Sequence, residues 1–96
     1  MSHSAVLTFQ AGHPATDGHF PGDPIIPGAV LLQAIARRLE QATPGLRCAE
    51  IVSAKFHTPI RPGDTIALEW SEHEQTRRFT ARLGTAPAVS GSLRLA

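Results

Sequence analysis

The stretch His19–Gln33, with the sequence HFPGDPIIPGAVLLQ, decides how the rest of the chain is interpreted. Its first half is a stiff loop, because three prolines fix their own backbone torsions and glycine allows close backbone approach. From Ala29 onward it is apolar and free of Gly and Pro, which predicts a helix. We expect the helix to begin at Gly28, where free N–H groups can bind a carbonyl oxygen that gains negative charge. The stretch therefore predicts a base, an oxyanion donor and an apolar wall close together.

A second stretch, Lys55–Asp64, reads KFHTPIRPGD. The two stretches, in this order, resemble the β-hydroxyacyl-acyl carrier protein dehydratases of the hot-dog fold. That family carries similar His-Phe-Pro-Gly-x-Pro-x-x-Pro-Gly and Lys-Phe-x-x-Pro-x-x-Pro-Gly-Asp segments. The resemblance extends roughly from Val6 to the C-terminus. It implies one α+β hot-dog domain over residues 1–96, with an antiparallel sheet wrapped around one long apolar helix.

The resemblance also implies a reaction and a site. The reaction is the elimination of water from a β-hydroxyacyl thioester on an acyl carrier protein or coenzyme A, as in fatty-acid or polyketide chemistry. His19 would be the base, and the N–H of Gly28 would hold the thioester carbonyl. An imidazole suits this role because it titrates near neutral pH. The walls of the substrate site would be Phe20, Pro21, Ile26 and Pro27.

Gln33 departs from the family pattern, which places Glu or Asp five residues after the Pro-Gly glycine. An amide can donate and accept hydrogen bonds, but it cannot deliver a titrating proton to a departing hydroxyl. Two roles stay open for Gln33. It is a structural residue bonded to a loop carbonyl, or it faces the substrate hydroxyl across a dimer interface. Asp17 is a weak substitute for the missing acid, and Asp23 is interpreted as a turn residue.

Three functions remain open at this stage. The first is a dehydratase, slowed by the loss of the acid. The second is a non-catalytic acyl-binding or partner subunit that contributes His19 to a site shared with an acid-bearing homologue. The third is an acyl thioesterase, for which Gln33 offers no evident help. If His19 only ties down its loop, His13 is the next candidate base.

Composition limits the class of protein. The formal net charge of the 96 residues is +1, which argues against a nucleic-acid binder, although Arg37-Arg38 or Arg77-Arg78 could meet an acidic carrier protein. We expect a cytoplasmic protein outside the membrane. The sequence has a single cysteine, Cys48, and it lacks a signal-like start and a long apolar run. No metal-ligand or nucleotide-binding motif is present, so we expect neither metal nor cofactor. A chain this short buries a modest core, which predicts a homodimer or a heteromer with a homologue.

Hydrophobic patterning predicts one helix followed by most of a sheet. The helix is expected over Ala29–Ala42 and, being apolar on nearly every side of its first turns, to be buried. Consecutive strands without βαβ alternation indicate an antiparallel sheet. The expected strands are Ala5–Gln10, Ala49–Pro59, Thr65–Glu74, Thr76–Leu83 and Ala88–Leu95.

Overall fold

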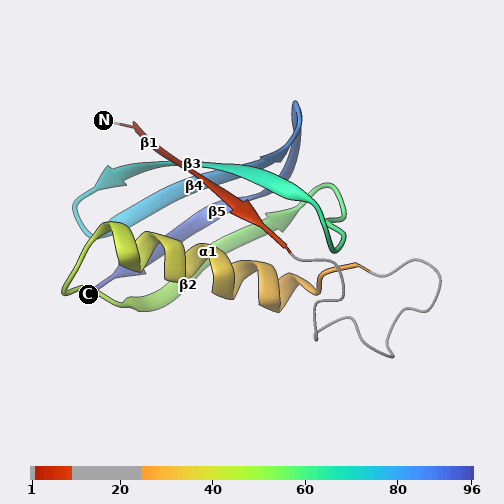
Figure 1. Ribbon diagram of the computed structural model, residues 1–96. Helices are drawn as coiled ribbons and strands as arrows, with labels where there is room; N and C mark the ends of the chain where they lie inside the picture. Colours follow the sequence, from red (N-terminus) through yellow and green to blue (C-terminus); the bar gives the residue numbers. More distant parts are fainter. Residues whose placement is uncertain (1, 10–24) are drawn as a thin grey trace.

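A five-stranded antiparallel sheet packs against one helix (Figure 1). The computed structural model describes residues 2–9 and 25–96. The strand order is β1-β3-β4-β5-β2, so β1 and β2 form the two edges. The elements are β1 (Ser2–Thr8), α1 (Gly28–Ala42), β2 (Cys48–Phe56), β3 (Thr65–His73), β4 (Thr76–Leu83) and β5 (Ala86–Leu95). This architecture confirms the predicted α+β hot-dog fold.

Element boundaries differ from the sequence-based expectation mainly where strand pairing decides them. The helix begins at Gly28, and β4 has its predicted limits. β1 starts three residues earlier than predicted, because it pairs with β3 along its whole length. β5 starts at Ala86, which pairs with Leu83 across a tight turn. β2 ends at Phe56, three residues before Pro59, where its end was expected.

The core lies between α1 and the facing side of the sheet. Leu31, Ile35 and Leu39, spaced four residues apart, are the buried residues of the helix. Alternate residues of the central strands meet them, including Leu68 and Phe79. Burial of this apolar area is the main term that stabilises the fold. We call this side of the sheet the inner face and the opposite side the outer face.

The expectation of a helix buried all round is wrong for the single chain. Ala29 and Gln33 are exposed, since the sheet covers only one side of α1. The apolar residues that surround its first turns leave more hydrophobic surface than one small sheet can cover. Val30 and Leu32 are accordingly only partly buried.

The edge strand β2 is irregular. Its pairing with β5 shifts register twice, between Cys48 and Glu50 and between Ile51 and Ser53. The backbone of β2 comes so close to Gly91 that a Cβ at this position would overlap the carbonyl of Ser53. Only glycine fits here, because the obstacle is main chain and cannot rotate away. Such shifts bend an edge strand and change the direction of its side chains.

Two further structural observations concern the described residues. No helix among them is both long and apolar enough to cross a membrane. Within residues 2–9 and 25–96, no three His, Cys, Asp or Glu side chains gather into a group that could hold a metal ion.

Candidate functional site

The two sequence motifs meet at the start of α1. The backbone N–H of Ile26 donates a hydrogen bond to the carbonyl of Ile60 at 2.7 Å. Both side chains are almost fully buried, Ile26 at 3% and Ile60 at 0% exposure. This contact joins the segment that leads into the helix to the Pro-Gly segment after β2. Residues some thirty positions apart in the chain therefore form one wall.

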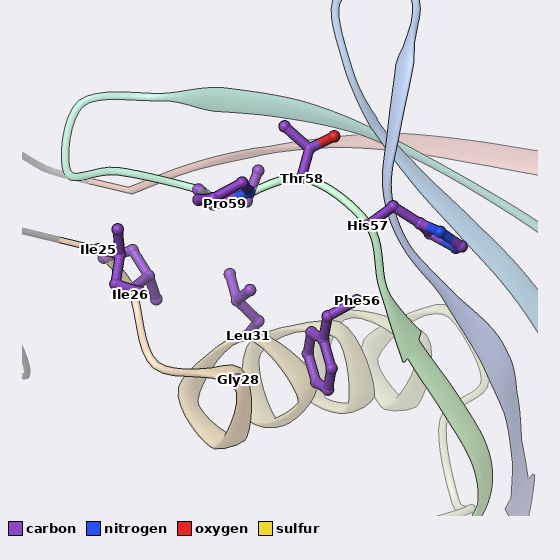
Figure 2. Close-up of a pocket in the computed structure, with 9 residues that line it drawn as sticks. Ile25, Ile26, Gly28, Leu31, Phe56, His57, Thr58 and Pro59 are labelled. Atoms are coloured by element: carbon purple, nitrogen blue, oxygen red, sulfur yellow. The ribbon is translucent and has the colours of Figure 1, made fainter.

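An apolar cavity of about 430 Å³ lies at this junction. Figure 2 shows the start of α1 on one side and the end of β2 with the following segment on the other. The cavity is large enough for an acyl thioester segment, since ligand sites commonly begin near 300 Å³. Its lining consists of Ile25, Ile26, Gly28, Leu31, Phe56, His57, Thr58, Pro59 and Ile60.

Gly28 and the ring of Phe56 are in direct contact across this cavity. A Cβ on Gly28 would lie 2.8 Å from Cζ of Phe56, which is closer than real Cβ atoms approach. Figure 2 shows the ring beside the first turn of the helix. Phe56 is nevertheless 53% exposed. The glycine therefore serves a close side-chain approach, and the ring retains space to move.

The start of α1 leaves backbone donors at the cavity. Pro27 precedes the helix, and its carbonyl accepts hydrogen bonds from Val30 at 3.0 Å and Leu31 at 3.1 Å. The N–H groups of Gly28 and Ala29 precede the first helical hydrogen bond. Because Gly28 also lines the cavity, its N–H is suited to a carbonyl oxygen on which negative charge develops.

The other predicted site residues divide into two groups. His19, Phe20 and Pro21 lie outside the described residues, as do His13, Asp17 and Asp23. Gln33 is exposed, on the side of α1 turned away from Leu31 and the sheet. An exposed amide can hydrogen-bond to water, so Gln33 does not need an internal partner in the single chain. That Gln33 faces the substrate hydroxyl across a dimer interface stays a prediction.

Sequence reasoning did not assign Phe56 or His57 to the site. The Lys-Phe motif could have indicated Phe56, because a strand end followed by a Pro-rich turn often borders a cavity. His57 lies at the rim, where its Nε2 is 2.9 Å from Oγ of Ser90. Figure 2 shows its imidazole turned away from Phe56. This hydrogen bond fixes the end of β2 against β5.

Cys48 lies at the opposite end of β2 and has a structural environment. Its backbone N–H donates to the carboxylate of Glu40 at 2.8 Å, which joins the end of α1 to the start of β2. Burial raises the pKa of the Cys48 thiol, and the nearby Glu40 carboxylate raises it further, against a lowering contact with the Glu50 carbonyl. A raised pKa disfavours the reactive thiolate. Cys48 therefore lacks the environment of a reactive nucleophile.

A sheet wrapped over one helix, with an apolar cavity beside the start of that helix, defines a protein of the hot-dog class. Residues 1–92 match the family described as ApeI-like, the ApeI dehydratase family. The chain belongs to this family.

Individual relatives agree with this assignment. The chain is 33% identical over 98 residues to the 3-hydroxyacyl-[acyl-carrier-protein] dehydratase FabZ of Haemophilus influenzae, covering 93% of the chain. It spans 66% of the length of that relative. Among solved structures, the ApeI:P dehydratase heterocomplex of Xenorhabdus doucetiae matches with a TM-score of 0.85 at 24% identity, over 99% of this chain and 87% of the other. The fluoroacetyl-CoA thioesterase FlK matches with a TM-score of 0.68 at 14% identity, over the whole chain and 84% of the other. These two structures establish the shared fold.

Proposed function

We propose that this chain is a subunit of a dehydratase that acts on β-hydroxyacyl thioesters. The observation that carries the proposal is the apolar cavity that Gly28 lines at the start of α1. A thioester carbonyl bound to that N–H would place the carbons beside it against Phe56 and Leu31. Family membership supports the same reaction. The acyl group would be carried on an acyl carrier protein or coenzyme A, and the expected location is the cytoplasm.

The chemistry follows from the residues that the cavity and the motif supply. His19 would remove a proton from the carbon beside the thioester carbonyl, while the N–H of Gly28 stabilises the charge on the carbonyl oxygen. The electron pair then forms the carbon–carbon double bond as the bond to the β-hydroxyl breaks. The hydroxyl leaves as water once it receives a proton. One oxyanion donor of this kind is worth about 3 to 4 kcal/mol in a site closed to water.

The proton for the leaving hydroxyl is the open step, because Gln33 cannot supply it. In a pair of identical chains, the imidazolium formed on His19 would return its proton. In a mixed pair, the carboxylic acid of a homologous chain would donate it. The second arrangement is favoured by the exposed, non-titrating Gln33, and one structure that shares the fold is itself a dehydratase heterocomplex.

The edge strand β2 supports assembly of the site from two chains. Its exposed apolar residues are Ile51 (39%), Val52 (54%) and Phe56 (53%). The strand also ends the sheet, so one row of its backbone groups faces outward. An open edge with apolar side chains is suited to pair with a second hot-dog chain. We therefore propose a dimer joined through β2, with an identical chain or a homologue as partner.

The test compares wild type with Gln33→Glu in the dehydration of a four-carbon β-hydroxyacyl thioester. Formation of the conjugated enoyl thioester is followed by its ultraviolet absorbance. If the chain pairs with itself, Gln33→Glu should accelerate turnover at least tenfold, because a general acid contributes about 10²- to 10⁴-fold. Gln33→Asn is the matched control and keeps the rate of the wild type.

The mixed assembly makes a different prediction in the same assay. Wild type and Gln33→Glu alone would both be almost inactive, and activity would appear on mixing the wild type with an acid-bearing dehydratase of its family. Loss of that activity in His19→Ala would show that this chain supplies the base. Inactivity of every variant, alone and mixed, while all remain folded, would contradict the dehydratase proposal.

A further inference from the structure

The outer face of the sheet carries a second hollow, of about 380 Å³, over β2, β5 and β4. It is more polar than the cavity beside α1. Four residues with hydroxyl groups and two cationic residues are among those that line it. The residues that line it are Ser53, Lys55, Arg78, Phe79, Thr80, Ser90, Gly91 and Ser92. We call it the outer groove.

Strand register arranges the polar residues of the outer groove in two rows. Lys55, Ser90 and Thr80 are paired neighbours across β2, β5 and β4. The second row, two residues along, consists of Ser53, Ser92 and Arg78. The two cations therefore occupy opposite corners, about 10 Å apart across the strands, with serines between them. Long flexible side chains at these corners can both reach an anion held over Ser90 and Ser92.

The cations of the outer groove differ from the other cations on the same face. Arg82 pairs with Glu69 at 3.3 Å, and Arg94 pairs with Glu50 at 3.5 Å. Lys55 and Arg78 have no carboxylate within ion-pair distance among the described residues. Glu69, the carboxylate on the row beside Thr80, is already engaged by Arg82. The outer groove thus keeps two positive charges beside several hydroxyl donors.

The end of β2 connects the outer groove to the apolar cavity. Adjacent residues of a strand point to opposite faces, and here Phe56 lines the cavity while Lys55 lines the outer groove. His57 borders the cavity, and its ring is hydrogen-bonded to Ser90 in the outer groove. A ligand with an apolar thioester end and an anionic end could therefore contact both around the end of this strand. Pairing through the edge of β2 would leave the outer face open, because such pairing lies in the plane of the sheet.

We propose that the outer groove binds the phosphoryl group of the phosphopantetheine arm that carries the acyl thioester. This rests on the proposed function, because it places the thioester of the same arm in the cavity beside Gly28. A phosphoryl group offers several acceptor oxygens, which match an ammonium, a guanidinium and neighbouring hydroxyl donors. The arm is common to carrier proteins and coenzyme A, so the chemistry is shared by both sources.

The experiment first compares two thioesters that differ only in the phosphate, with one β-hydroxyacyl group presented on pantetheine and on 4′-phosphopantetheine. The same acyl group is then presented on coenzyme A and on a carrier protein, which both contain the phosphorylated arm. The measured quantity is the ratio of kcat/KM for the phosphorylated to the unphosphorylated thioester. We expect this ratio to fall about tenfold in Lys55→Gln and in Arg78→Gln, the loss of one charge-assisted hydrogen bond. Arg82→Gln and Arg94→Gln, on the same face, are the matched controls and keep the ratio.

The remaining outcomes decide whether the outer groove binds a phosphoryl group, independently of the proposed function. An equal effect on both thioesters, or none, excludes a phosphoryl site in the outer groove. An effect confined to the carrier-protein thioester identifies a contact with the carrier surface instead. A fall seen with coenzyme A and carrier alike supports the shared phosphoryl group. If wild type turns over no thioester, either alone or mixed with an acid-bearing dehydratase of its family, the proposed function fails. Calorimetric binding of 4′-phosphopantetheine then tests the outer groove by itself. Loss of that binding in both variants supports the phosphoryl site, and absence of binding in wild type overturns it.

Discussion

The two edges of the sheet are built differently. β1 pairs with β3 in unbroken register and has one exposed large hydrophobic residue, Val6. Its start is anchored by His3, which stacks on Trp70 at 5.5 Å between ring centroids and lies 3.2 Å from a Glu72 carboxylate oxygen. β2 shifts register twice, exposes three large hydrophobic residues and borders both the cavity and the outer groove. Regular pairing and polar contacts hold one edge, whereas irregular pairing at the other leaves apolar side chains exposed beside the cavity and the outer groove.

The largest effect should come from breaking the close approach that shapes β2. Gly91→Ala would place a Cβ on the backbone of Ser53, so β2 must separate from β5 or the fold must shift. We expect a loss of about 3 kcal/mol or more in the free energy of unfolding, measured by urea denaturation. Thr8→Ala is the control at the β1 edge. It removes only an exposed hydroxyl contact with Thr65 and should cost less than about 1 kcal/mol. Equal stability of Gly91→Ala and wild type would mean that β2 does not press on Gly91.

The second prediction tests which edge meets a partner. Val52→Glu places a charge among the exposed apolar residues of β2 and should convert dimers to monomers at micromolar concentration. Val6→Glu makes the same substitution on β1 and should leave the dimer intact. Sedimentation velocity measures both. Dissociation by Val6→Glu with Val52→Glu unaffected would assign the interface to the wrong edge.

The third prediction concerns the contact between β2 and the start of α1. Gly28→Ala would push the Phe56 ring aside while keeping the backbone N–H. Since that ring is half exposed and can turn, stability should change by less than about 1 kcal/mol. Turnover should fall about tenfold, because small displacements of a positioned carbonyl are costly. In a Phe56→Leu background, the same glycine substitution should have a smaller effect, and equal losses in both backgrounds would show that the ring is not the obstacle.

The smallest effect is expected at the far end of β2. Because burial raises the pKa of Cys48, less thiolate is present at a given pH, and alkylation should be slower than for an unfolded thiol. The alkylation rate of the folded protein should therefore increase at higher pH values than the alkylation rate of the same chain in denaturant. Glu40→Gln removes a carboxylate that also raises this pKa, so it should accelerate alkylation severalfold. Its side-chain oxygen can still accept the hydrogen bond from the Cys48 N–H, which keeps the strand in place. Identical pH profiles in folded and unfolded protein would contradict this environment.

Much of this protein could be predicted from short-range features of the sequence. The Pro-Gly step fixes where α1 begins, because proline restricts the torsions before it and the apolar run continues from Gly28. Turn residues separate the strands, so β3 and β4 were predicted within one residue. The position of Gly28 at the first residue of the helix also followed from the sequence. These features depend on residues that are neighbours in the chain.

The tertiary structure decided what depends on distant residues. Phe56 reaches Gly28, and Ile26 bonds Ile60, only because the helix folds back over the end of β2. Gly91 appeared in the sequence as one small residue in a strand, and its necessity follows from the shifted register of another strand. Lys55 and Arg78 are brought to one groove by pairing through β5, which no local pattern specifies. Backbone torsions and the spacing of apolar residues determined where the helix and strands form. Packing across the whole core set the strand order and register, and these determined which distant residues lie next to one another.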